Sequence, residues 1–131
     1  MSFRVKERKF KENFSAGIKN PSINYKLGIS EEFNIVHPKE IEEFIKDKEG
    51  SVELINSSLE LLKKYFPEGK YSLEFYQDYE IPNWNWVDIC VLDEVNSLDD
   101  SMEIFDKLLK EFIILINDYK DLREFYHVFL N

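Results

Sequence analysis

The stretch NWVDICVLD at residues 85–93 decides how this chain folds. In an extended chain, successive side chains point to opposite faces. Both faces of this stretch are apolar, and the residues that alternate between them are Trp86, Val87, Ile89, Cys90, Val91 and Leu92. A strand that is apolar on both sides is typical of a position covered on both faces. We therefore expect residues 85–93 to form the central strand of a sheet.

The segment that precedes this strand predicts its first neighbour. Residues 71–79 alternate apolar and polar side chains, which predicts a strand with one buried face and one wetter face. The wetter face would carry Ser72, Glu74, Tyr76 and Asp78. The connection at residues 80–84 is short enough for an antiparallel hairpin.

The segments that follow predict a second neighbour. Residues 99–118 place apolar side chains on a broad helical face, and residues 122–130 return to alternation. A strand, a helix and a strand in this order predict a βαβ unit with parallel strands. Residues 85–93 would then lie between an antiparallel and a parallel neighbour.

The first half of the chain adds helices and a weaker strand signal. Helices are expected at residues 38–50 and 51–66, because proline and glycine bound both segments. Short β-like runs at residues 23–27 and 33–36 predict a small hairpin. Together these patterns predict a single-domain α+β fold: a small mixed sheet with a β-hairpin and a βαβ unit, and helices packed on one face.

Charge divides the 131 residues into two parts. Residues 1–20 carry six basic and two acidic side chains, which gives them a net charge of +4. The whole chain has a net charge of −9, so residues 21–131 carry −13. We expect a basic N-terminal arm or edge strand at residues 1–20 and a single acidic domain at residues 21–131. A nucleic-acid binder needs basic groups across its docking face, so nucleic acid is an improbable partner except through the arm.

Several further classes of protein are excluded or disfavoured. The longest apolar run, residues 112–116, is too short to cross a bilayer, which predicts no membrane contact. Cys90 is the only cysteine and the N-terminus lacks an apolar signal region, so a cytoplasmic protein is expected. The four glycines are isolated from one another and form no phosphate-binding loop, and no cofactor is expected.

Aromatic and acidic residues cluster around the expected hairpin at residues 80–84. These residues are Tyr76, Asp78, Tyr79, Glu80, Trp84, Trp86 and Asp88. Aromatic anchors with a charged rim are typical of protein interfaces, whereas both tryptophans could instead complete the core. The pattern favours a non-enzymatic protein–protein interaction module. Such a module would bind a basic partner, as an inhibitor or antitoxin does, or self-associate into a homo-oligomer through the basic arm and the acidic body.

Two catalytic alternatives remain open at this stage. Asp78, Glu80 and Asp88 offer oxygen ligands, so a divalent-metal-dependent enzyme that uses these hairpin carboxylates is the alternative function. The hairpin would have to bring Asp78 close to Asp88. Cys90 and His127 lie on neighbouring expected strands and are formally available as a nucleophile and a base, although a buried structural cysteine is the simpler interpretation.

Short motifs between residues 51 and 131 resemble a family of small uncharacterised prokaryotic α+β proteins. In that family a helix ends in Phe-Pro and a strand ends in Asp-Pro-Glu, and an apolar strand and an amphipathic helix follow. The corresponding residues here are Phe66-Pro67 and Asp78-Tyr79-Glu80, with Tyr79 in place of the proline. The resemblance implies the same order of elements and a possible place beside defence or toxin–antitoxin systems, and it implies no chemistry.

Overall fold

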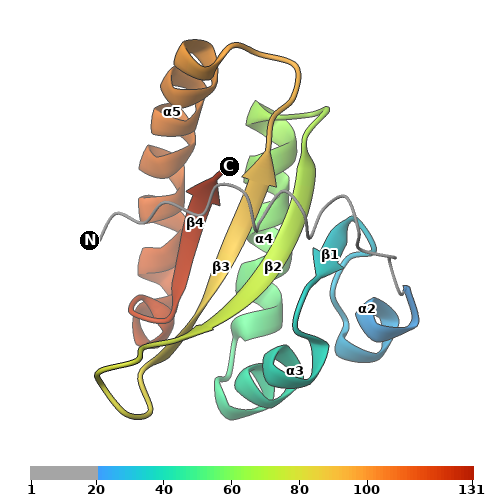
Figure 1. Ribbon diagram of the computed structural model, residues 1–131, viewed down its shortest axis with the longest axis vertical. Helices are drawn as coiled ribbons and strands as arrows, with labels where there is room; N and C mark the ends of the chain where they lie inside the picture. Colours follow the sequence, from blue (N-terminus) through green and yellow to red (C-terminus); the bar gives the residue numbers. More distant parts are fainter. Residues whose placement is uncertain (1–20) are drawn as a thin grey trace.

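A four-stranded sheet forms the centre of residues 21–131, the part of the chain that the computed structural model describes (Figure 1). The elements follow in the order α2 (Pro21–Leu27), β1 (Phe33–Ile35), α3 (Pro38–Asp47), α4 (Ser51–Tyr65), β2 (Lys70–Gln77), β3 (Asn85–Leu92), α5 (Leu98–Ile116), the 3-10 helix η1 (Asn117–Leu122) and β4 (Tyr126–Leu130). This arrangement confirms the predicted α+β fold class. The predicted basic arm or edge strand at residues 1–20 lies outside the described residues.

The order of the strands in the sheet is β1-β2-β3-β4, which places β3 inside the sheet as its apolar faces predicted. β2 and β3 form the expected antiparallel hairpin. β3 precedes α5 in the chain and β4 follows it, and these two strands pair in parallel. The last strand is shorter than its alternation predicted, because Leu122 ends the 3-10 helix η1 and residues 123–125 form a turn.

The hydrophobic core lies between the sheet and its helices. Leu73, Ile89 and Val128 occupy one row across β2, β3 and β4, and all three are buried. They belong to one cluster with buried residues of the helices, among them Ile41, Leu54, Leu62, Leu108 and Phe112. The helices therefore cover this face of the sheet, which we call the apolar face.

The first described segment differs from its prediction. Residues 23–27 form part of a helix rather than a strand, and β1 pairs in parallel with β2 instead of forming a hairpin. Residues 23–27 alternate apolar and polar side chains, which favours a strand, but Ile23 and Leu27 are four residues apart and also share one face of a helix. Five residues are therefore too few for periodicity to distinguish the two. The side chain of Asn24 decides the local structure, because its Nδ2 donates hydrogen bonds to the carbonyls of Ser30 (2.7 Å) and Phe33 (2.8 Å).

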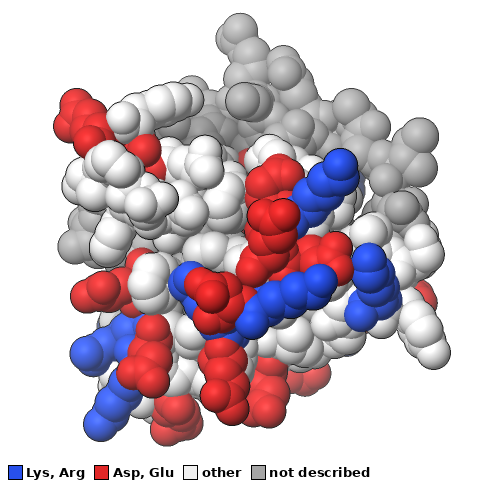
Figure 2. All heavy atoms as spheres, turned by 90° about the horizontal axis from the view of Figure 1, so that it is seen from below, with Lys and Arg blue, Asp and Glu red and all other residues white. Residues whose placement is uncertain are grey.

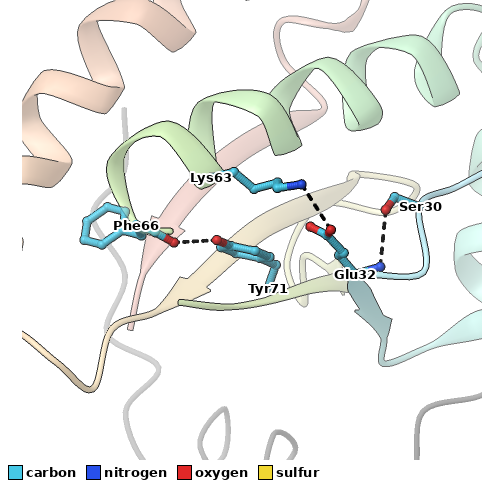
Figure 3. Close-up of polar contacts among 5 residues, drawn as sticks. All are labelled: Ser30, Glu32, Lys63, Phe66 and Tyr71. Carbon is cyan, nitrogen blue, oxygen red and sulfur yellow. Dashed lines mark hydrogen bonds and ion pairs between the residues drawn. The ribbon is translucent and has the colours of Figure 1, made fainter. Parts of the chain in front are cut away.

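The loop before β1 is held against α4 by side-chain contacts (Figure 3). Lys63 Nζ lies 3.1 Å from Glu32 Oε1, and the backbone N–H of Glu32 donates to Ser30 Oγ at 3.2 Å. The Tyr71 hydroxyl donates to the carbonyl oxygen of Phe66 where α4 has ended. These contacts fix the position of β1 at one edge of the sheet.

None of the helices within residues 21–131 is both long enough and apolar enough to cross a membrane.

Candidate interaction site at the hairpin

The register of the β2–β3 hairpin separates the predicted site residues into two groups. Tyr76 lies opposite Trp86 within the sheet, and Asp88 lies opposite Glu74. The remaining residues, Asp78, Tyr79, Glu80 and Trp84, belong to the loop between the strands. We call residues 78–84 the hairpin tip, and the side of the sheet that carries Glu74, Asp88 and His127 the polar face.

The polar face is more deeply buried than its sequence predicted. Glu74, Asp88 and His127 form one row across β2, β3 and β4, and Glu74 and Asp88 each expose only 3% of their surface. Ser72 is buried as well, so the prediction of a wetter face is wrong for the middle of β2. Alternation along β2 identified which side chains share this face but could not predict how deeply the folded chain buries them.

Each carboxylate of the polar face has partners close by. The Tyr76 hydroxyl donates to Glu74 Oε1 at 2.7 Å, and Cys90 Sγ lies 3.8 Å from Glu74 Oε2. His127 Nδ1 lies 3.6 Å from Asp88 Oδ1. Cys90 and His127 therefore contact different carboxylates, and Cys90 is a buried structural thiol that makes a weak hydrogen bond.

The two tryptophans have different environments. Trp86 exposes 4% of its surface and stacks on Tyr76, with ring centroids 5.8 Å apart. Trp84 exposes 37% of its surface and lies against Phe125, with ring centroids 6.2 Å apart. Trp86 and Tyr76 thus belong to the packed polar face, whereas Trp84 belongs to the surface.

Hydrogen bonds to Asp78 give the hairpin tip a defined shape. Asp78 Oδ1 accepts from the backbone N–H groups of Glu80 (2.7 Å) and Ile81 (2.9 Å). The backbone N–H of Asp78 donates to the carbonyl of Trp84 at 2.9 Å, and Asn83 adopts a left-handed conformation with φ of 65°. Asp78 is therefore the residue that organises the turn, as aspartate does in many loops.

The organised loop presents apolar side chains to solvent. Tyr79 is fully exposed, Ile81 is more than half exposed, and Trp84 lies beside them in the chain. Ile81 was not among the residues predicted for the site. Its position between turn-forming residues, where no core strand or helix passes, was the available signal.

The acidic residues between Lys70 and Lys107 do not form one continuous surface. Glu74 and Asp88 are buried in the sheet, and Asp78 is engaged in the turn. Figure 2, which views the molecule from the end with the hairpin, shows acidic and basic side chains interspersed. At this end of the molecule, electrostatic attraction therefore comes from the total charge rather than from a patch of acidic side chains alone.

Asp93, another acidic residue between Lys70 and Lys107, has a structural role between β3 and α5. Burial alone raises the pKa of its carboxyl, but hydrogen bonds from Ser101, Asn96 and the backbone N–H groups of Val95 and Asn96 together lower the pKa. The Ser101 hydroxyl donates to Asp93 Oδ2 at 2.5 Å, which ties the end of β3 to the start of α5.

The carboxylates proposed for a metal site are not brought together. Asp78 lies in the tip, whereas Asp88 lies in the sheet opposite Glu74, so the predicted approach of Asp78 to Asp88 is wrong. Within residues 21–131, no group of three His, Cys, Asp or Glu side chains has the arrangement of a metal site.

No protein-family model, curated protein or solved structure matches this chain.

Proposed function

We propose that this protein is a non-enzymatic protein–protein interaction module that binds a basic protein partner through its hairpin tip. The observation that carries the proposal is the exposure of Tyr79, Ile81 and Trp84 in a loop whose backbone is fixed by Asp78. Large aromatic side chains supply most of the binding free energy in many interfaces.

The hairpin tip is also suited to binding because it is pre-organised. Trp84 lies against Phe125, and Phe125 in turn packs edge-on against Phe44, with centroids 6.1 Å apart. Phe44 belongs to the core, so a continuous series of rings connects the exposed anchor to the folded body. Less conformational entropy is lost on binding when the anchors are already positioned.

The proposed partner is basic because of the net charge of the module. Residues 21–131 carry a net charge of −13, and Glu80 places one of these carboxylates at the exposed tip. A net negative field raises the association rate of basic partners and disfavours acidic ones. A toxin or another protein with a nucleic-acid-binding surface has this character, which supports an inhibitor or antitoxin-like role.

We further propose that the protein acts in the cytoplasm. Cys90, the only cysteine, is a fully buried thiol that forms no disulfide, which suits a reducing compartment.

The proposal is tested with a double variant of the tip and a matched control. Tyr79→Ser with Ile81→Ser removes two exposed anchors, whereas Tyr25→Ser with Ile114→Ser removes the same residue types from exposed positions elsewhere. The tagged wild-type protein is used to capture a partner from the source cells, and the partner is then purified and titrated by calorimetry. We expect the tip variant to weaken binding at least about tenfold and the control to bind like the wild type.

Equal losses in the tip variant and the control would contradict the assignment of the site. An acidic partner, or an affinity that does not fall with rising salt, would contradict the electrostatic part of the proposal.

A further inference from the structure

A second surface, formed by β4 and α5, is separate from the hairpin tip. We propose that this surface binds a second copy of the chain and forms a two-fold symmetric homodimer. In this dimer β4 pairs antiparallel with its counterpart, and α5 packs antiparallel against its counterpart. The inference rests on the proposed function as an interaction module and identifies one partner and its surface.

The first observation is the open edge of β4. Among the described strands β4 has one neighbour, β3. The N–H of Val87 donates to the carbonyl of Phe125, and the N–H of Asn131 donates to the carbonyl of Val91. In a parallel ladder with this register, the backbone groups of alternate residues point away from the partner strand. These residues are Tyr126, Val128 and Leu130. Tyr126 exposes only 1% of its surface and Val128 8%, whereas Leu130 is partly exposed, so the accessible part of the edge is its C-terminal half, at Val128 and Leu130.

The sequence of this edge lacks the usual protection against strand pairing. β4 reads YHVFL, with no lysine, proline or acidic residue. Soluble proteins commonly protect exposed edges with charge, proline or a very short strand. The opposite edge shows such protection, because β1 has three residues and contacts α2. The unprotected edge at β4 therefore indicates a strand that is paired when the protein functions.

The second observation is a row of apolar side chains along α5. Their spacing of three or four residues places them on one side of the helix. We call this row the α5 stripe, and it consists of Leu98, Met102, Phe105, Leu109 and Ile113. Leu98, Met102 and Ile113 are exposed, and the other two are partly exposed.

The α5 stripe points toward the same side of the molecule as the β4 edge. Glu111 contacts Lys64 and Tyr65 of α4, so it marks the side of α5 that faces α4. With 3.6 residues per turn, the α5 stripe lies roughly half a turn around the helix from Glu111. In Figure 1, α5 lies beside β4 at the outer edge of the sheet, whereas α4 lies behind β2 and β3. The α5 stripe and the open edge are therefore accessible to one partner.

One two-fold axis satisfies both surfaces. A two-fold axis perpendicular to the sheet pairs β4 with a second β4 in antiparallel orientation, which forms one sheet of eight strands. Because α5 precedes β4 and runs opposite to it in the βαβ unit, the same axis also makes the two α5 helices antiparallel. An interface of this kind uses the same patch on both copies.

The charges beside the α5 stripe are complementary in this orientation. Residues 98–106 carry four acidic side chains and no basic ones, whereas Lys107 and Lys110 follow in the next turn. When the middle of the α5 stripe lies on the axis, Lys110 of one copy approaches Asp99 and Glu103 of the other. A parallel arrangement would instead place the acidic turns side by side.

The first experiment compares two neighbouring isoleucines by sedimentation equilibrium over a range of concentrations. Ile113 lies in the α5 stripe and Ile114 lies off it, and they expose 58% and 69% of their surfaces. We expect the wild type to reach twice the monomer mass. Ile113→Glu should raise the dimer dissociation constant at least about tenfold, and Ile114→Glu should leave it unchanged.

A charge exchange and hydrogen exchange locate the interface. Lys110→Glu should weaken the dimer, and adding Glu103→Lys in the same chain should restore it. In the dimer the amide protons of Val128 and Leu130 should exchange slowly, and in Ile113→Glu they should exchange rapidly. Circular dichroism spectra of all variants confirm that the fold is retained.

The outcomes separate this inference from the proposed function. Tyr79→Ser with Ile81→Ser should leave the dimer intact, and Ile113→Glu should leave the tip able to bind its basic partner. A monomer at every concentration, an equal effect of Ile114→Glu, or rapid exchange of the β4 amide protons in the dimer would each overturn the inference.

Discussion

The two faces of the sheet are built from the same strands and differ in what they bury. On the apolar face, Leu73 and Ile89 form a hydrocarbon row that packs against the helices. One residue further along, Glu74 and Asp88 form a polar row that is almost as deeply buried. The difference indicates that the apolar face supplies most of the stability and that the polar face restricts the sheet to one register.

The restriction follows from the period of a strand. A slip of one residue would turn Glu74 and Asp88 into the hydrocarbon core and expose the apolar row on the other side. Burying an unpaired carboxylate costs far more free energy than a lost hydrocarbon contact. The polar face therefore excludes the slipped pairing even where it adds little to the free energy of unfolding.

The largest effect is expected on the apolar face. Ile89 and Cys90 are consecutive, both completely buried, and point to opposite faces. Ile89→Ala should lower the free energy of unfolding by about 2–5 kcal/mol, because it leaves a cavity in the core. Cys90→Ala should lower it by only about 1 kcal/mol, since it removes a small side chain and a weak hydrogen bond. Urea denaturation measures both, and equal losses would refute the contrast between the faces.

A smaller effect is expected when the polar row is changed. Glu74→Ala removes the acceptor for the Tyr76 hydroxyl and should cost about 1–3 kcal/mol of unfolding free energy. Glu74→Gln keeps an acceptor oxygen and removes the like charge opposite Asp88, so it should cost less. Thermal unfolding at pH 7 distinguishes these cases. A greater loss in Glu74→Gln than in Glu74→Ala would show that the charge itself is required.

The smallest effect at neutral pH is expected for Tyr126, on the apolar face. Burial raises the pKa of its hydroxyl from 10.0 to about 12, and the nearby Ser51 hydroxyl lowers it by less. Below pH 10 the hydroxyl is protonated in both states, so stability is unaffected by this group. Between pH 10 and pH 12 only the unfolded chain loses the proton, and the free energy of unfolding falls.

Tyr126→Phe should therefore change stability little at pH 7 and should reduce the loss of stability at alkaline pH. Urea midpoints between pH 8 and pH 12 measure this slope. Tyr25→Phe, at an exposed position, is the control and should follow the wild type. An unchanged alkaline slope in Tyr126→Phe would show that this hydroxyl does not titrate as proposed.

The central part of the fold could be predicted because its signals are long and local. Residues 85–93 are apolar on both faces, and residues 99–118 repeat apolar side chains over several turns of helix. These patterns correspond to β3 and α5, with ends that differ by a few residues. The prediction for residues 23–27 was wrong because alternation over only five residues does not distinguish helix from strand, and a contact from Asn24 to Phe33 decided the outcome.

The candidate site was predicted in part. The aromatic cluster near the hairpin was found, but the chain did not reveal which of its residues are exposed. Trp84 and Trp86 are two residues apart and should share a face of a regular strand, yet the strand begins at Asn85 and only Trp86 lies within it. Where a strand ends is set by the hydrogen bonds of the tip, which involve Asp78 and the backbone of Trp84.

By itself, the sequence determined the order of the main helices and strands from residue 33 onward, the central position of β3 and the division of charge along the chain. Each of these depends on the chemistry of neighbouring residues or on a period of two or 3.6 residues. The tertiary structure alone decided that Glu74 lies opposite Asp88, that Tyr79, Ile81 and Trp84 form the exposed tip, and that β4 is the outermost described strand, beside an apolar side of α5. These features depend on register and packing between segments far apart in the chain, which no local pattern specifies.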